Sequence, residues 1–175
     1  MELKTQSDLA KCVDTAPVFQ RGFNLLELMI TVAMAGILFG AGVPGFVRLV
    51  ESNRVSATTN ELVNAVNVAR SEAIQRGELV TVCSSTDGAT CADAEDWSSG
   101  WVVLAEDGSL LRSWSEIGTA GTLVASADNI RFQGRGWLDS AAASFELRMP
   151  RCAGTEGRDL SVNLAGRVFV DRVAC

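Results

Sequence analysis

The sequence lacks the side chains on which most enzyme chemistry depends. It has no histidine and no tyrosine, and its only lysines are Lys4 and Lys11. Beyond residue 11 this excludes catalytic triads with an imidazole base, Schiff bases and imidazole metal sites. No serine, cysteine or aspartate stands in the sequence with the partner that would activate it. We therefore expect a protein that is not an enzyme and that holds no cofactor and no metal ion.

The chain also carries fewer positive than negative charges. Its 175 residues carry a net charge of -6, with a pI near 4.7, and 47% of them are hydrophobic while only 6% are aromatic. This length and composition predict one domain of ordinary size with an appendage. The acidic balance argues against a surface built throughout for a polyanion, so any nucleic-acid binding has to be local.

The first 22 residues lack the apolar core, roughly 7 to 15 residues long, that an ordinary secretory signal needs. From Phe23 to Val47 the chain then holds a single charged side chain, Glu27, in 25 residues. A helix of that length measures about 37 Å, enough to cross the ~30 Å hydrocarbon layer. The sequence predicts a leader over 1–22 and one transmembrane helix over 23–47, with the rest of the chain outside the cytoplasm.

A helical pattern continues beyond the apolar segment. Apolar residues recur at helical spacing, at Val55, Leu62, Val66, Ala69 and Ala73, and charged residues fill other positions. Arg76 suits the negative end of a helix, and Gly77 suits the left-handed conformation that closes one. We expect an amphipathic continuation over 48–77, which makes one helix from about residue 23 to residue 76, with Ala69, Ala73 and Ile74 packed on the first strand.

After Gly77 the pattern changes to short strand-like runs separated by turn residues. The expected strands are 79–83, 101–105, 110–114, 129–132, 145–149, 160–164 and 167–170. Asp107-Gly108 between two of these runs is the strongest hairpin signal. A long helix followed by an antiparallel sheet predicts an α+β protein, with a β-rich globular domain over 78–175.

Glu27 is the most informative single residue. A carboxylate four residues into an apolar span costs at least a few kcal/mol unless it finds a partner. Cleavage of the chain after Gly22 would create that partner, the α-amino group of Phe23, which could lie against Glu27 of a neighbouring subunit. The alternative is a side chain that reaches the membrane interface and has no further role.

The segment GFNLLELMITVAMAGIL, residues 22–38, resembles the type III signal of type IV pilins and of type II secretion pseudopilins. The resemblance implies that a prepilin peptidase cleaves between Gly22 and Phe23 and methylates the new N-terminus at Phe23. It also implies that Glu27 guides subunit docking. The implied fold is pilin-like, a long and partly transmembrane N-terminal helix packed on a C-terminal antiparallel β-sheet domain.

A second set of segments, 67–77, 80–83 and 100–103, resembles the GspH/FimT group of minor pilins; the two resemblances together reach from residue 22 to about residue 114. They imply a minor pilin that assists type IV pilus assembly and twitching motility, or alternatively a minor pseudopilin of a type II secretion system. Implied partners are the prepilin peptidase, other major and minor pilins or pseudopilins, and the inner-membrane assembly platform. The implied location is the bacterial inner membrane, with a periplasmic C-terminal domain that is extracted into a filament.

The resemblance also implies a second alternative, a pilus-associated DNA receptor for natural transformation. Some members of this group bind DNA through a Gly-Arg-x-Arg motif, of which this sequence keeps only Gly166-Arg167. The charge distribution also supports DNA binding near the C-terminus, because residues 51–130 carry a net charge of -8 whereas residues 131–175 carry a net charge of +2. A phosphate-binding patch would draw on Arg148, Arg151, Arg158, Arg167 and Arg172. The alternative is a solvated surface in which arginines pair with Glu146, Glu156, Asp159 and Asp171.

The five cysteines become an even set if the leader is removed, because Cys12 precedes Gly22. Cys83, Cys91, Cys152 and Cys175 then remain, which suits two disulfides in an oxidising periplasm. Pairing of Cys83 with Cys91 and of Cys152 with Cys175 joins elements close in sequence, although three pairings are formally open. A four-cysteine zinc site is the alternative, but the chain has no C-x-x-C spacing.

Overall fold

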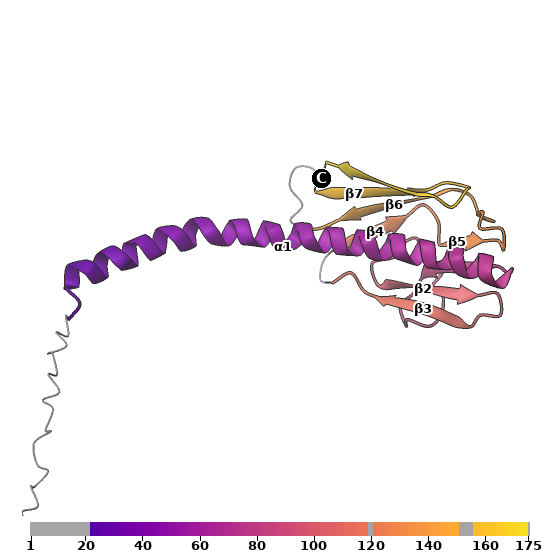
Figure 1. Ribbon diagram of the computed structural model, residues 1–175, viewed down its shortest axis with the longest axis horizontal. Helices are drawn as coiled ribbons and strands as arrows, with labels where there is room; N and C mark the ends of the chain where they lie inside the picture. The colour runs from indigo at the N-terminus through magenta and orange to yellow at the C-terminus, as the bar shows by residue number, and fades with distance from the viewer. Residues whose placement is uncertain (1–21, 119–120, 151–155, 175) are drawn as a thin grey trace, which may run out of the picture. The chain divides into compact units, whose positions relative to one another are not determined.

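The computed structural model describes residues 22–118, 121–150 and 156–174, except for the side chains of residues 41–45 and 48. The chain forms two compact units, Met1–Ala41 and Gly42–Cys175. One long helix is followed by strands (Figure 1). The elements are α1 (Leu25–Arg76), β1 (Val80–Ser84), β2 (Gly100–Ala105), β3 (Leu110–Ser115), β4 (Thr122–Ala125), β5 (Asn129–Phe132), β6 (Ala143–Arg148), β7 (Gly157–Val162) and β8 (Val168–Val173). The predicted α+β class is confirmed.

Helix α1 begins two residues later than predicted because Asn24 caps it. The Asn24 side-chain oxygen accepts a hydrogen bond from the Leu26 amide at 3.4 Å, and its carbonyl accepts one from the Leu28 amide at 3.1 Å. Asparagine is among the preferred residues at this position, where its oxygen replaces a missing helical acceptor. The helix therefore starts at Leu25 and not at Phe23.

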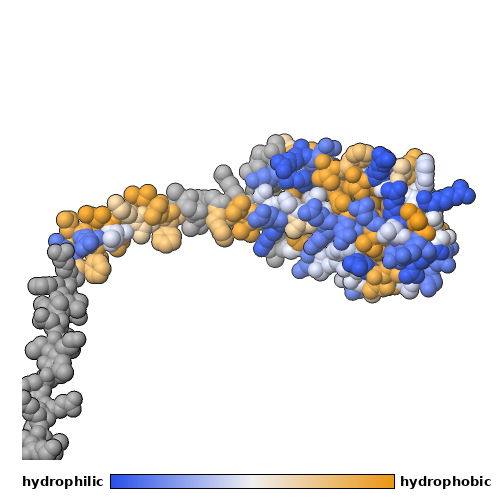
Figure 2. All heavy atoms as spheres, in the orientation of Figure 1, coloured by the Kyte–Doolittle hydropathy of each residue, from blue (hydrophilic) through white to orange (hydrophobic). Residues whose placement is uncertain are grey.

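The described part of the N-terminal unit is an apolar helix whose side chains face outward. Phe23, Leu25, Ile37 and Phe39 are 72–82% exposed, and apolar side chains dominate this unit in Figure 2. Within the described residues, no helix is both long enough and apolar enough to cross a membrane. The span predicted over 23–47 includes side chains outside the described set, at 41–45, and stays a prediction.

In the globular unit, the predicted amphipathic face of α1 is confirmed. Its members are at most 1% exposed: Val55, Leu62, Val66, Ala69 and Ala73. The prediction for Ile74 is wrong, since that side chain is 52% exposed. Ile74 directly follows Ala73, the last of these buried residues, near the end of the helix. Gly77 closes the helix as predicted, at φ 71°, with its amide donating to the Ala73 carbonyl at 2.8 Å.

The strands form two antiparallel sheets of four, where the sequence predicted one sheet. Sheet A has the order β3-β2-β1-β5, and sheet B has the order β4-β6-β7-β8. Both sheets and α1 contribute to one hydrophobic core. Trp97 helps to join them, because its ring meets Phe145 of β6 edge-on, with centroids 4.9 Å apart. The hairpin at Asp107-Gly108 is confirmed, with Gly108 at φ 81°.

Candidate functional site

The junction between Gly22 and Phe23 is accessible in the structure. Phe23 is 82% exposed, and Gly22 is also exposed, immediately ahead of the first turn of α1. Glu27 lies in that turn, three residues after the cap Asn24. A carboxylate there interacts favourably with the positive end of the helix dipole. Glu27 is exposed and is in no ion pair with another described residue.

The predicted disulfide between Cys83 and Cys91 is present, with 5.5 Å between the Cα atoms. Asp87 organises the loop that it closes. One Asp87 carboxylate oxygen accepts bonds from the Ala89 and Thr90 amides, both at 2.8 Å, and the other accepts one from the Thr90 hydroxyl at 2.7 Å. These bonds hold the pKa of Asp87 well below its usual range. Cys152 and Cys175 lie outside the described residues.

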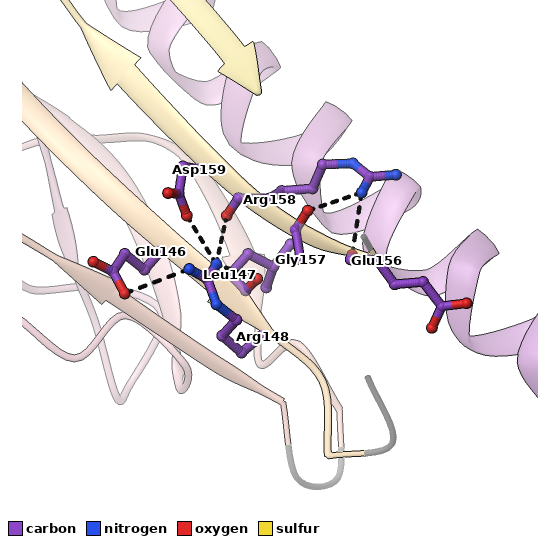
Figure 3. Close-up of polar contacts among 7 residues, drawn as sticks. All are labelled: Glu146, Leu147, Arg148, Glu156, Gly157, Arg158 and Asp159. Atoms are coloured by element: carbon purple, nitrogen blue, oxygen red, sulfur yellow. Dashed lines mark hydrogen bonds and ion pairs between the residues drawn. The ribbon is translucent and has the colours of Figure 1, made fainter. Parts of the chain in front are cut away.

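Arg148 lies on the outer face of sheet B and is held by carboxylates (Figure 3). One of its terminal nitrogens is 2.8 Å from an oxygen of Asp159 on β7, and the other is 3.7 Å from Glu146 on its own strand. Of the two interpretations drawn from the sequence, this contact matches the solvated surface with ion pairs. The charge of Arg148 is thus partly neutralised within the sheet.

Arg158 points the opposite way, toward α1 (Figure 3), and is only 8% exposed. Its guanidinium donates to the backbone carbonyls of Glu156, at 3.1 Å, and Gly157, at 2.9 Å. Burial, followed by the nearby charge of Arg172, lowers the pKa of Arg158, while Glu156 opposes the shift. Arg158 and Arg172 are register partners on β7 and β8.

Of the five arginines predicted to bind DNA, the four that the structure describes are thus not gathered on one surface. Arg148 and Arg158 face opposite sides of sheet B, and Arg167 precedes β8, exposed, in the turn that follows β7. Arg151 lies outside the described residues. The structure brings together Arg158 and Arg172. The predicted patch included both residues but did not separate them from Arg148, although the apolar residues at alternate positions, Leu160 and Val162, could have placed Arg158 on the inner face.

Comparison with known proteins identifies the family. A family model described as "Type II transport protein GspH" matches residues 58–166. The fold is similar to that of the type IV minor pilin FimU of Pseudomonas aeruginosa in two crystal forms, at 23% identity in each. The TM-score is 0.56 in space group P21, covering 70% of this chain and 92% of FimU, and 0.52 in space group P65, covering 66% and 91%.

A third similar structure is the minor pseudopilin EpsH from the type 2 secretion system of Vibrio cholerae. It matches at 10% identity and a TM-score of 0.48, covering 68% of this chain and 97% of EpsH. The long helix of this chain, the two antiparallel sheets and the family match over more than half of the residues agree with one another. The chain therefore belongs to the GspH/FimT family of minor pilins and pseudopilins.

Proposed function

We propose that the chain is a minor pilin that is built into a type IV pilus and assists pilus assembly and twitching motility. One observation carries the proposal. An outward-facing apolar helix begins directly behind the accessible junction of Gly22 and Phe23, with a single carboxylate, Glu27, in its first turn. An apolar surface on every side of a helix is stable only in a lipid bilayer or among other apolar helices.

In the proposed mechanism, segment 23–47 anchors the precursor in the inner membrane, and the prepilin peptidase cleaves between Gly22 and Phe23. The cleavage leaves an α-amino group at Phe23, which the peptidase then methylates. In the filament this cation pairs with Glu27 of a neighbouring subunit. A charge pair in an apolar surrounding is strongly favoured over two isolated charges, so it fixes the axial position of one helix against the next.

Replacement of Gly22 tests the cleavage step. In a Gly22→Val variant we expect the precursor to accumulate in the membrane fraction, because a branched side chain now flanks the bond that the peptidase must reach. Immunoblotting should show a band longer by the 22 leader residues. Gly36→Ala is the matched control, since a Cβ at Gly36 would meet no atom within 4 Å. Normal maturation of the Gly22 variant would overturn the proposal.

A second candidate is a minor pseudopilin of a type II secretion system, and the description of the matching family favours it. Both candidates require the same cleavage and the same filament assembly, so their sites are identical. Deletion of the gene distinguishes them. Loss of twitching with normal protein export supports the pilus, whereas loss of export with normal twitching assigns the chain to secretion.

A further inference from the structure

Two of the four edge strands of the sheets are covered by the chain's own backbone. Along β4, the Trp97 amide donates to the Leu123 carbonyl at 2.8 Å. Along β5, the Asp139 amide donates to the Arg131 carbonyl, also at 2.8 Å. Uncovered edge strands present unpaired backbone groups to which other chains can bind, so proteins commonly protect them in this way.

The other two edge strands, β3 and β8, have no such cover among the residues that the structure describes. Strand β3 differs from β8 in two features that discourage pairing. Its register against β2 shifts between Val103 and Leu104, and it exposes Arg112 and Ser113 near its centre. Strand β8 keeps an unbroken register with β7 over its whole length. It is therefore the regular open edge of sheet B.

The backbone groups on this open edge belong to Val168, Val170 and Arg172. The Asn163 amide donates to the Arg167 carbonyl at 3.0 Å, and this bond fixes the first bonded pair between β7 and β8. Bonded and non-bonded pairs alternate along an antiparallel ladder, so the intervening residues of β8 bond to β7. The three outward residues thus offer donors and acceptors at every second position, which is the spacing that a further strand needs.

The first half of β8 is apolar on both faces. Phe169, on the outer face of sheet B, is 51% exposed, and Val170, on the inner face, is 42% exposed. A groove of about 370 Å³ lies beside Val170, and Val63 contributes to its α1 wall. An added strand would place alternate side chains beside Phe169 and toward this groove. The charged residues Asp171 and Arg172 discourage unselective pairing in the second half of β8.

We propose that an extended segment of a neighbouring pilin-family subunit pairs with residues 168–170 of β8 and continues sheet B in the filament. The proposal rests on the proposed function, because the occupant is a subunit of the same filament. Only an extended backbone matches the row of donors and acceptors on the open edge. An antiparallel pair of two β8 strands would be two-fold symmetric and closed, whereas a filament adds its subunits head to tail.

Filament incorporation of a Val170→Pro variant tests the pairing. Proline removes the outward amide but none of the bonds from β8 to β7, and edge strands tolerate it at such positions. We expect the amount in sheared filaments, relative to membrane protein, to fall about tenfold, because a partner carbonyl loses its donor. Val170→Thr is the matched control, since it keeps the amide and the branched shape, and it should incorporate as the wild type does. Thermal unfolding in detergent shows whether both variants fold.

Photo-crosslinking identifies the occupant. A benzophenone amino acid in place of Phe169, an exposed aromatic residue, should capture an extended segment of another pilin-family subunit. The Val170→Pro change should reduce this product by a similar factor. Any product from the same amino acid at Leu110, which is 46% exposed on β3, should not depend on Val170. A Phe169 product that Val170→Pro leaves unchanged would count against the proposal.

Hydrogen exchange on the wild-type chain provides a test that does not depend on a variant. In the free mature chain in detergent, the Val170 amide should exchange about tenfold faster than the Phe169 amide, because only the latter bonds to β7. Equal protection of both amides in dilute free chain would mean that the edge is already covered. Protection of Val170 that rises with the concentration of the chain alone would indicate a dimer. Either result overturns the proposal.

The outcomes distinguish this inference from the proposed function. If the wild-type chain enters filaments and folded Val170→Pro enters them equally well, the strand-pairing proposal alone fails. If the wild-type chain enters neither a pilus nor a secretion pseudopilus, both fail.

Discussion

Gly100, the first residue of β2, is a position where the pairing of β2 with β3 depends on a single residue. Its φ is 122°, a backbone conformation that other residues rarely adopt. A Cβ built there would lie 2.5 Å from the carbonyl oxygen of Trp114 on the paired strand β3. Neither backbone can withdraw without loss of the strand pairing, so only glycine fits.

We therefore expect a Gly100→Ala substitution to reduce the free energy of unfolding by about 2–4 kcal/mol, from backbone strain and steric overlap together. Chemical denaturation of the full chain in detergent measures the change. Gly108→Ala is the matched control: its φ is also positive, at 81°, but a Cβ there would meet no atom within 4 Å. It should cost about 1 kcal/mol. Equal losses in the two variants would refute the role of the contact with Trp114.

Residue-level prediction from the sequence succeeded where neighbouring residues set the geometry. Cys83 and Cys91 were correctly paired because the short segment between them contains the turn residues Asp87-Gly88, and Gly88 adopts φ 70°. The five arginines were grouped only by their closeness in sequence. Side chains along a strand alternate between the two faces of its sheet. The sequence alone does not show which strands pair or which element covers each face.

At the scale of elements, α1 carries two different surfaces. Before Ala41 its apolar side chains are exposed all round, whereas in the globular unit one face is buried under the sheets. Leu62 is 1% exposed and belongs to the common core. The buried positions of this face are apolar. Their burial, and not charged contacts, therefore docks the helix on the two sheets.

Truncation of Leu62 to alanine should lower the free energy of unfolding of the globular unit by about 2–5 kcal/mol, the usual cost of a cavity in a packed core. Thermal unfolding followed by circular dichroism provides the measurement. Ile74→Ala removes a side chain of similar size that is 52% exposed and should cost less than about 1.5 kcal/mol. A loss at Leu62 no larger than that at Ile74 would contradict the assigned helix face.

The elements were predicted well except where the chain depends on distant contacts. Strands β1, β2, β3, β5 and β6 lie within two residues of their predicted bounds, because each has a run of strand-forming residues between turn signals. Strand β4 was missed. Its four residues, Thr122–Ala125, are flanked by small residues, and its position is stabilised by pairing with β6 and by the backbone bond from the Trp97 amide to Leu123.

For a similar reason, the sequence could not show that the strands form two sheets and not a single sheet. The sequence shows strand-like runs and turns, but the choice between sheets depends on which runs pair. Here β5 returns to pair with β1, while β4 pairs with β6. These contacts join residues far apart in the chain, and neither hydrophobic period nor turn chemistry specifies them.

At the scale of the whole molecule, the proposed assembly depends on the charge of Glu27 and not on its shape. In a Glu27→Gln variant we expect processing to continue and the amount of protein in sheared filaments to fall about tenfold, because the neutral amide cannot pair with the α-amino group of the next subunit. Immunoblots of filament and membrane fractions measure both steps. A variant that enters filaments as the wild type does would refute the pairing.

Glu78→Gln provides the matched control for this change. Glu78 is an exposed carboxylate just beyond α1, outside the proposed contact, so its neutralisation should leave both processing and incorporation unchanged. An equal loss in both variants would show that the effect follows net charge in general.

Because Trp137 is exposed, the intrinsic tryptophan fluorescence of the chain can report on its surroundings. With no tyrosine in the sequence, near-ultraviolet emission comes from four tryptophans. Trp97 and Trp101 are fully buried, Trp114 is partly buried, and Trp137 is 58% exposed. A collisional quencher such as acrylamide will therefore act mainly on Trp137, at the turn between β5 and β6. Whether a neighbouring subunit covers that turn can be read from unlabelled protein, as a loss of quenching upon polymerisation.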